Sequence, residues 1–368
     1  MVGRFAGVKS SRGRVIEVDS AEELDERLAA GATSLSGWHL HSIDLTGRGE
    51  TLRSVRVSGA LFLGCTFDDG DEAAVLSRGG IVFPVVPGLP VDAYRSRLYS
   101  PTELYDTTDY QDSFDARAYA WSRRPADHDS TLAAALHDHA IDEALAAWVA
   151  IRRLVGVMGG HSAERGSVEY AAAARLGRAL AATHVVATGG GPGAMEAANL
   201  GAWLSTQEAA ALDEAQALLA RVPDFRPDIG AWARVALDVL ARFPGGAKSL
   251  GIPTWHYGHE PSNPFATAIA KYFHNPDREA ILLEVCDAGI VFLPGAAGTV
   301  QEIFQDACEN YYADESSVAS MVLVGVEHWT TTVPAWPLLQ ALSAGRPMEA
   351  HVHLVDSVDE AAELMVAR

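Results

Sequence analysis

Short apolar runs broken by glycine and proline mark the first part of the chain. Residues 13–20 alternate between polar and apolar side chains, which predicts a strand, and Ser20 is placed to cap a helix that follows it. The apolar runs at 60–65 and 80–86 predict further short strands. No period is strong enough to indicate a repeat. We therefore expect residues 1–130 to form a small α+β domain of unknown role.

The second part of the chain has a different pattern, in which apolar strands alternate with amphipathic helices. A mixed, loop-rich stretch at 97–131 and a helix predicted at 130–150 lead into it. Repeated strand–helix order is typical of the α/β class and predicts a Rossmann-like, doubly wound parallel sheet over residues 131–368. Residues 205–247 look like an acidic helical insertion in this domain. The predicted strands are 154–158, 185–187, 249–252, 288–293, 318–326 and 351–355.

Three glycine-rich turns follow predicted strands, at 159–160, at 189–193 and at 295–298. In an open parallel sheet such turns meet at one edge, where helix N-termini offer unpaired N–H groups and a partial positive charge. A single turn is weak support because glycine is also the ordinary turn residue, but three together favour a phosphate-binding edge. Neither G-x-x-x-x-G-K-[ST] nor a G-x-G-x-x-G after the first strand of this domain occurs. A P-loop ATPase and a nicotinamide dehydrogenase are therefore disfavoured.

Composition and charge narrow the range of partners that we expect for this chain. The chain has 48 acidic and 28 basic residues, for a net charge of −20, so we expect neither nucleic acid nor a membrane surface as a partner. No apolar run approaches the roughly 18 residues of a membrane span, and the N-terminus lacks the apolar stretch of a secretory signal. Three cysteines, an odd number in a long chain, fit a reducing compartment better than a disulfide framework. We expect a cytoplasmic protein.

The amino-acid sequences of these turns resemble those of a known family. Gly-Gly-His-Ser at 159–162, Gly-Gly-Gly-Pro-Gly-Ala-Met-Glu at 189–196 and Pro-Gly-Ala-Ala-Gly-Thr at 294–299, followed by Glu302, are similar to motifs of the Lonely Guy (LOG) family. Glu-Pro-Ser-Asn-Pro at 260–264 brings the chain closer to the family's long bacterial branch, the pyrimidine/purine nucleotide 5′-monophosphate nucleosidases. The resemblance covers about residues 150–326. Members are often labelled lysine decarboxylases.

The resemblance implies a fold, a reaction and a site. It implies a Rossmann-like nucleotide-binding domain that hydrolyses the N-glycosidic bond of nucleoside 5′-monophosphates, without a cofactor or a metal, in a homodimer or larger homo-oligomer. Arg278 and Glu302 would be the catalytic residues. Ala296 departs from the family pattern, which has glycine there, and its methyl group would narrow the approach of the phosphate. The implied substrate- and phosphate-binding residues are Gly159, Gly160, His161, Ser162, Gly190, Gly191, Gly193, Met195, Glu196, Gly295, Ala296, Ala297, Gly298 and Thr299.

The chemistry of Arg278 and Glu302 fits this reaction when it is considered residue by residue. Cleavage of an N-glycosidic bond builds positive charge on the ribose, which a nearby carboxylate stabilises. Glu302 lies three residues beyond Thr299, so it would face back over the turn. Arg278 is suited to bind a phosphate in a bidentate manner or to orient Glu302. Without the surrounding motifs, Glu302 would be read as an acidic residue in the first turn of a helix, and Arg278 as a surface residue in an ion pair.

Several alternatives remain open. A lysine decarboxylase needs a lysine Schiff base, for which the chain offers only Lys9, Lys248 and Lys271, and none of them has a suitable context. A nucleotide or phosphate-bearing cofactor carrier, for example of a pterin, would keep the glycine edge without catalysis. The histidine pairs at 256–259 and 351–353 lack the spacing or the third ligand of a metal site, so no metal site is predicted.

Overall fold

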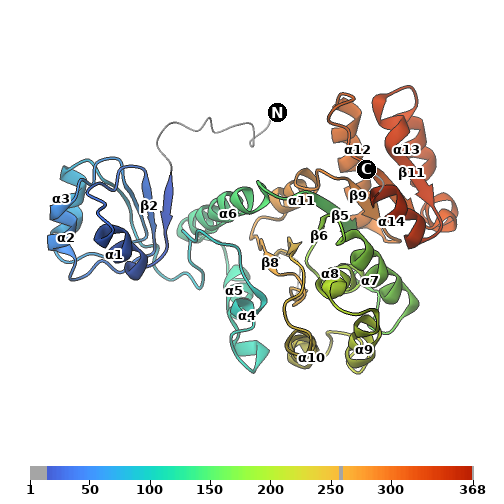
Figure 1. Ribbon diagram of the computed structural model, residues 1–368, viewed down its shortest axis with the longest axis horizontal. Coiled ribbons are helices and arrows are strands. Elements are labelled where there is room, and N and C mark those ends of the chain that lie inside the picture. The colour runs from blue at the N-terminus through green and yellow to red at the C-terminus, as the bar shows by residue number, and fades with distance from the viewer. Residues whose placement is uncertain (1–14, 257–259, 367–368) are drawn as a thin grey trace. The chain divides into compact units, whose positions relative to one another are not determined.

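The computed structural model describes residues 15–256 and 260–366 and divides the chain into two compact units. Unit 1 comprises the chain up to Leu98 together with Pro125–Ala147, and unit 2 comprises Tyr99–Arg124 and the chain from Trp148 onward. Each unit contains one parallel sheet flanked by helices, as Figure 1 shows, with four strands in unit 1 and seven in unit 2. The predicted α/β class is therefore confirmed.

Unit 1 is built from successive strand–helix repeats. Its strands β1 (Ile16–Val18), β2 (Trp38–His41), β3 (Leu61–Leu63) and β4 (Ile81–Phe83) pair in sequence order, and α1 (Ala21–Ala29), α2 (Gly49–Ser54) and α3 (Asp71–Ser77) connect them. Register partners lie 22 residues apart between β1 and β2 (Ile16 and Trp38) and between β2 and β3 (His39 and Leu61). The interval is 20 residues between β3 and β4 (Leu61 and Ile81). The structure thus contains a repeat that the sequence analysis did not detect.

One face of this sheet forms the core of unit 1. Val18, Leu40 and Phe62 are fully buried against Leu24 of α1 and the other helices, because alternate residues of a strand point to the same side. Ser20 caps α1 as predicted, since its side chain accepts the N–H of Glu23. The helix predicted at 130–150 is also confirmed, as α6 (His128–Val149).

The sheet of unit 2 reverses its strand order beside its first strand. From one edge to the other the order is β11-β10-β9-β5-β6-β7-β8, and every pair is parallel. From β5 the chain adds β6, β7 and β8 toward one edge, and it then returns to add β9, β10 and β11 toward the other edge. The strand order therefore reverses between β5 and β9, and the crevice at such a reversal is where α/β sheets bind ligands. The strands are β5 (Leu154–Met158), β6 (Val185–Thr188), β7 (Ser249–Gly251), β8 (Ala268–Ile269), β9 (Ile290–Phe292), β10 (Met321–Val324) and β11 (Val352–Val355).

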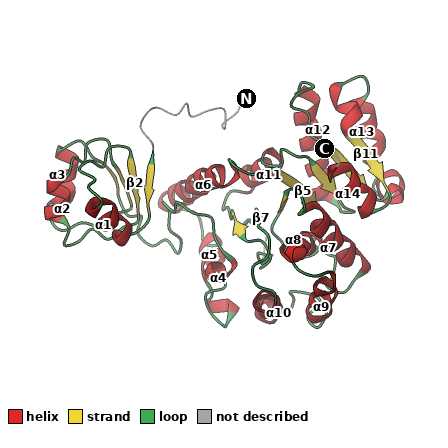
Figure 2. Cartoon of the chain, in the orientation of Figure 1, coloured by secondary structure: helices red, strands yellow, loops and turns green. Residues whose placement is uncertain are grey.

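Helices cover this sheet in two groups, which can be followed in Figure 2. One group is α7 (Val168–Leu180), α8 (Ala194–Trp203) and α14 (Val358–Val366), in which α7 packs against the other two. The second is α11 (Asn275–Glu284), α12 (Ala297–Tyr312) and α13 (Trp336–Ser343), in which α12 packs against both neighbours. The strands are therefore buried on both sides and read as continuous apolar runs.

Two further segments complete unit 2. The stretch expected to be loop-rich forms α4 (Pro101–Leu104) and α5 (Phe114–Ser122), and the insertion forms α9 (Ala209–Leu219) and α10 (Ile229–Arg242). Residues of α9 and α10 enter the main core, since Leu212, Ala236 and Val239 are buried in it. The insertion is therefore an integral part of the packed unit rather than an appended loop.

A buried ion pair anchors α5 to the rest of unit 2. Lys271 Nζ lies 2.6 Å from Asp115 Oδ1, and both side chains are almost fully buried. Asp115 also accepts hydrogen bonds from Trp255 Nε1 and from the Tyr110 hydroxyl, while Lys271 donates to Ser262 Oγ. Every charge in this cluster is thus partnered, as burial requires.

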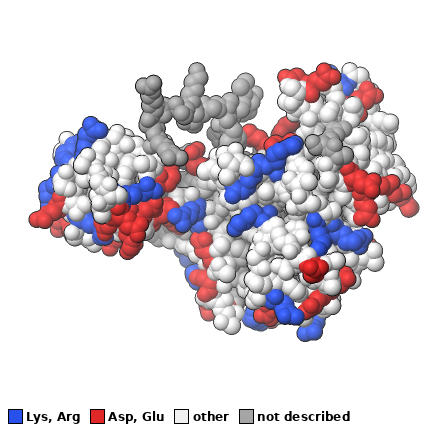
Figure 3. Space-filling view, in the orientation of Figure 1, with Lys and Arg blue, Asp and Glu red and all other residues white. Residues whose placement is uncertain are grey.

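The surface and the cysteines offer less information about function. Figure 3 shows acidic and basic side chains interspersed over the visible face of each unit. Among the described residues, no helix is long and apolar enough to cross a membrane. All three cysteines are free; Cys65 and Cys286 are buried, and Cys308 is exposed on α12.

Candidate functional site

The turns after β5 and β9 meet where the strand order reverses. The N–H of Gly160 donates to the carbonyl oxygen of Pro294 over 3.4 Å. A Cβ atom at position 159 would lie 3.0 Å from Leu293 Cβ and 3.1 Å from Ala194 Cβ, so close packing favours the glycine. The first and third glycine turns are therefore brought together at the switch point.

The turn after β6 is buried under other segments. Gly190 and Gly193 have φ angles of +72° and +74°, which favour glycine, and a Cβ atom at 193 would lie 2.6 Å from the carbonyl carbon of His161. Asn263 covers the turn, because its N–H donates to the Gly190 carbonyl and its Nδ2 donates to the Gly191 carbonyl. The amides of this turn are less open to a ligand than those of the turn after β9.

The start of α12 is the open helix end of the site. Ala296, Ala297 and Gly298 are exposed, and a Cβ atom at Gly298 would meet nothing within 4 Å. The first N–H to bond within the helix is that of Val300, which donates to the Ala296 carbonyl, so the earlier amides have no acceptor in the helix. Thr299 is buried with its hydroxyl lying over Gly295. This end has the geometry of an anion-binding helix N-terminus.

Glu302 lies one turn further along α12, in a largely buried setting. Burial raises the pKa of its carboxyl group from 4.5 to about 7; the Arg278 charge opposes this shift and Glu279 adds to it. A pKa near 7 means that the group exchanges a proton near neutral pH, which is the range of an acid–base catalyst. The structure therefore brings the two predicted catalytic residues into one electrostatic environment.

Arg278 acts on the turns as well as on Glu302. Its side chain is 9% exposed; Nε donates to the Ile252 carbonyl and Nη2 to the Gly189 carbonyl. The guanidinium thus holds the turns after β6 and β7, a contact that sequence reasoning did not anticipate. Two of its donor atoms are committed to the backbone, which restricts the bidentate phosphate contact considered from the sequence.

The other predicted binding residues fall into two groups. His161 and Ser162 are exposed, and His161 Nδ1 lies 3.7 Å from a carboxylate oxygen of Glu260. Met195 packs its thioether against Gly189 and Gly191. Glu196 is fully buried and paired with Arg165, whose Nε lies 3.1 and 3.2 Å from its two carboxylate oxygens. The carboxylate of Glu196 is thus engaged by the fold.

A pocket of about 160 Å³ borders the turns after β5 and β6. Its walls come from three segments, one of which is the loop between α9 and α10. Neither Glu302 nor Arg278 lines it, so the pocket and the carboxylate are separate features of the site. The lining residues are His161, Ser162, Ala163, Glu164, Pro192, Gly193, Glu196, Pro223, Asp224, Phe225, Arg226 and Trp232.

Two residues contact the glycine turns in a way that the sequence did not predict. His328, which follows β10, donates from Nε2 to the Gly295 carbonyl over 2.9 Å. Asn263 was noted only within a resembling motif, yet it fixes the turn after β6. Neither position has a signal in the local sequence, because both contacts join segments that are distant in the chain. His259, which was considered together with His256 for a metal cluster, lies outside the described residues.

Within the described residues, metal-ligating side chains do not gather around the glycine turns. The group of three that does converge, Glu17, His39 and His41, belongs to unit 1. The arrangement in unit 2 can therefore seat an anion on backbone amides beside a carboxylate with a raised pKa.

No protein-family model matches the chain, and no curated protein matches it. Among solved structures, the molybdenum cofactor binding protein from the phototrophic bacterium Rippkaea orientalis is similar, with 17% identity and a TM-score of 0.36 over 59% of this chain and 96% of that one. The molybdenum cofactor carrier protein from Chlamydomonas reinhardtii is also similar, with 17% identity and a TM-score of 0.37 over 59% of this chain and 99% of that one. At this identity and TM-score the likeness assigns neither a family nor an activity.

Proposed function

We propose that unit 2 hydrolyses the N-glycosidic bond of a nucleoside 5′-monophosphate, as expected for a member of the Lonely Guy family. The observation that carries the proposal is the position of Glu302, one helical turn beyond the open N-terminus of α12. An anion held by the amides around Gly298 would place the sugar attached to it near that carboxyl group. Phosphate and carboxylate thus have separate, adjacent places on one helix.

The reaction follows from these two places. Water adds to C1′ of the ribose as the bond to the base breaks, and the base leaves with a proton. Glu302, when ionised, stabilises the positive charge that builds on the sugar or orients the water. Arg278 keeps part of the Glu302 population ionised at neutral pH, because its positive charge opposes the effect of burial on that pKa. No cofactor is needed for these steps.

The direct test is release of free base from AMP, GMP, CMP and UMP, followed by chromatography. We expect the wild-type chain to release base from at least one of them and Glu302→Gln to be slower by about 100-fold or more. Glu309→Gln, on the same helix and two turns away, is the matched control and should keep the wild-type rate. Equal rates in Glu302→Gln and the wild type would contradict the proposal.

The alternative is a carrier of a nucleotide or of another phosphate-bearing cofactor. It is favoured by Ala296, whose methyl group stands at the helix start where the family has glycine, and by the commitment of Arg278 to two backbone carbonyls. Stoichiometric nucleotide binding by the wild-type chain, with no base released over hours, would support the carrier and exclude the hydrolase.

We also propose a homodimer or larger homo-oligomer that uses the end of α12. Tyr312 is 81% exposed, and its ring meets that of Tyr311 edge-on with centroids 5.1 Å apart. Arg346 stacks over Tyr311 and keeps that ring in place. Exposed aromatic rings of this kind are common in interfaces. Light scattering after size exclusion should give at least twice the chain mass, and Tyr312→Ser should reduce it.

A further inference from the structure

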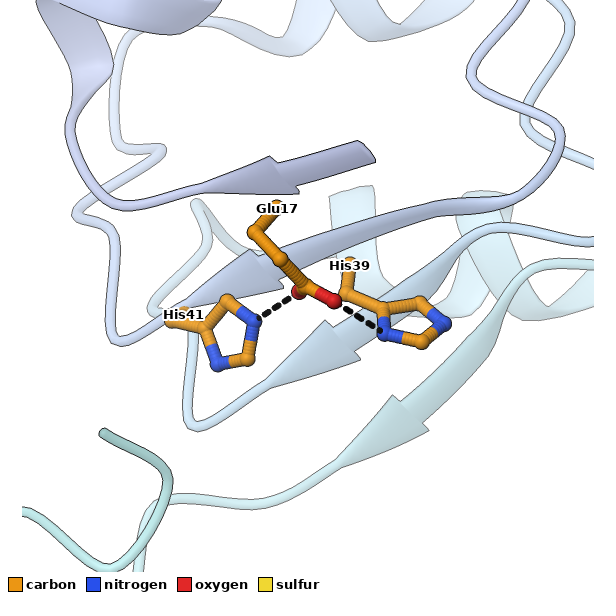
Figure 4. A group of neighbouring side chains, drawn as sticks. All are labelled: Glu17, His39 and His41. Carbon is orange, nitrogen blue, oxygen red and sulfur yellow. Dashed lines mark hydrogen bonds and ion pairs between the residues drawn. The ribbon is translucent and has the colours of Figure 1, made fainter. Parts of the chain in front are cut away.

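Three polar side chains converge on the face of the unit 1 sheet that lies opposite its core. Glu17 of β1 is the register partner of His39 of β2, and His41 lies two residues further along β2 on the same face. Figure 4 shows the carboxylate of Glu17 between the two imidazole rings. One oxygen lies 2.6 Å from His41 Nε2 and the other 3.4 Å from His39 Nδ1.

The hydrogen bond on the far side of His41 fixes its tautomer. His41 Nδ1 lies 2.7 Å from the carbonyl oxygen of Tyr94, and a carbonyl can only accept, so Nδ1 carries a proton. In the neutral ring Nε2 is then a bare lone pair that faces a carboxylate oxygen. At 2.6 Å the two atoms share a proton, carried by the ring or by the carboxyl group, and a metal ion that replaced this proton would be bound by the same two atoms.

This arrangement is also the usual support of a metal-binding histidine. A ligating imidazole commonly donates its other N–H to a backbone carbonyl, which orients the ring toward the ion, and Tyr94 supplies that carbonyl. We propose that Glu17, His39 and His41 bind a divalent transition-metal ion of the zinc class. Two imidazoles and one carboxylate match the donor set of three-ligand zinc sites, which keep a further position for water.

The distances fit such an ion with little movement. Candidate ligand atoms of the three residues all lie within 4.8 Å of one another. Zinc bonds of about 2.0–2.2 Å imply tetrahedral ligand separations of roughly 3.3–3.5 Å. The separation between Glu17 and His39 already has this value, and that between Glu17 and His41 needs to open by less than about 1 Å. Rotation about the Glu17 side chain provides this shift because Glu17 is exposed.

The surroundings favour a cation. The negative charge of Asp19 acts on His41 together with that of Glu17, and Arg97, whose Nη2 lies 2.6 Å from Asp19 Oδ2, offsets part of it. The neighbouring strand contributes Leu61 and Leu63 to the same face, opposite His39 and His41. Apolar neighbours limit the competing water ligands and strengthen the attraction of the carboxylates for the ion. The site lies in unit 1, so it is independent of the function proposed for unit 2.

The test is Zn²⁺ binding by the full chain after metal removal with a chelator. Competition with a chromophoric chelator should give one tightly bound Zn²⁺ per chain, and Co²⁺ should give visible d–d bands of a low-coordinate site. Glu17→Gln, His39→Ala and His41→Ala should each weaken Zn²⁺ by about 100-fold or more. His184→Ala in unit 2 is the matched control and should bind as the wild type does.

Two results would overturn the proposal. One is that the wild-type chain binds no Zn²⁺ at micromolar concentrations, in which case a protonated His41 accounts for the short contact with Glu17. The other is Zn²⁺ binding that survives all three substitutions, which would place the ion elsewhere. Circular dichroism of each metal-free variant checks folding, and Glu17→Gln, which keeps the side-chain shape, decides the outcome if a histidine variant does not fold.

Discussion

Arg165 and Glu196 form an ion pair in which each side chain is only 1% exposed. The same guanidinium donates to the carbonyl oxygen of Trp232 over 3.0 Å and stacks 4.4 Å above its ring. Because Glu196 belongs to α8 and Trp232 to α10, the pair fastens the insertion to the helix that follows the second glycine turn. The acidic residue expected to touch substrate thus has a structural partner.

Glu196→Gln should destabilise unit 2 strongly, since it leaves the Arg165 charge buried without its counterion. We expect the free energy of unfolding in urea to fall by about 3–5 kcal/mol. Glu214→Gln in the insertion is the matched control, because Glu214 pairs with Arg242 at an exposed position and its loss should cost no more than about 1 kcal/mol. Equal losses in the two variants would show that burial of the pair is unimportant.

The pH dependence of base release should report Glu302. Burial raises its pKa to about 7, so the ionised, charge-stabilising form grows as the pH rises, and kcat/KM should increase through pH 7. Glu279→Gln removes a negative neighbour that contributes to the raised pKa, so the rising limb should move to lower pH. A limb that stays in place in this variant, or a rate that falls between pH 6 and 8, would contradict the assignment.

Two glycine substitutions separate packing from anion binding. Gly193→Ala forces a Cβ atom to within 2.6 Å of the His161 backbone at a φ of +74°, so it should lower the melting temperature by several degrees. Gly298→Ala meets nothing within 4 Å and should leave the melting temperature unchanged. If α12 binds the phosphate, Gly298→Ala should weaken nucleotide binding in calorimetry; unchanged affinity would move the phosphate elsewhere.

Asp306 should make the chain less stable as the pH rises. Burial raises its pKa well above 3.8, and Oδ2 has no hydrogen-bond partner among the described residues. The folded chain therefore keeps a proton that the unfolded chain releases, so stability falls as the pH rises from about 4 toward the folded pKa. Asp306→Asn cannot ionise and should be more stable than the wild type at pH 8 by about 1–3 kcal/mol, with the difference vanishing near pH 4 in urea unfolding.

Pyridoxal phosphate should not form a Schiff base at Lys271. Its side chain is 1% exposed and Nζ donates to Asp115 and Ser262, so an aldehyde has no access to the amino group. Borohydride reduction followed by peptide mass spectrometry should leave Lys271 unlabelled, whereas exposed Lys248 serves as the positive control. A label on Lys271 would revive the lysine decarboxylase interpretation.

Much of the fold of unit 2 was predictable because its strands are buried on both faces and read as apolar runs between helices. The strand Trp38–His41 was not predicted, since two of its four residues are histidines that lie outside the core. The repeat of unit 1 was not detected because its strands are only three or four residues long and do not share one pattern. The outer face carries Glu17 in β1 and histidines in β2, but leucines in β3. The helix α5 is tied to unit 2 by the Asp115–Lys271 pair, whose members are 156 residues apart, so the local sequence of 99–124 carries no sign of this contact.

The glycine turns of the candidate site were predictable, and the roles of Glu302 and Arg278 in it stay predictions. The environment of these two residues was not predictable, because the pKa of Glu302 depends on burial and on charges from another helix. The partner of Glu196, 31 residues earlier in the chain, had no signal in the local sequence. The same reasoning that examined the histidines at 351 and 353 applies to His39 and His41, whose third ligand comes from the adjacent strand and emerges only in three dimensions.

The regular interval of 20 to 22 residues between the strands of unit 1 has a consequence for how this unit can vary. Each strand and its helix form one coil that contacts only the coils before and after it, so inserting or deleting about 22 residues adds or removes a coil without disturbing the cross-section. Length is then the property most readily changed by gene duplication, provided that β1 and β2 stay adjacent and keep Glu17 beside His39 and His41.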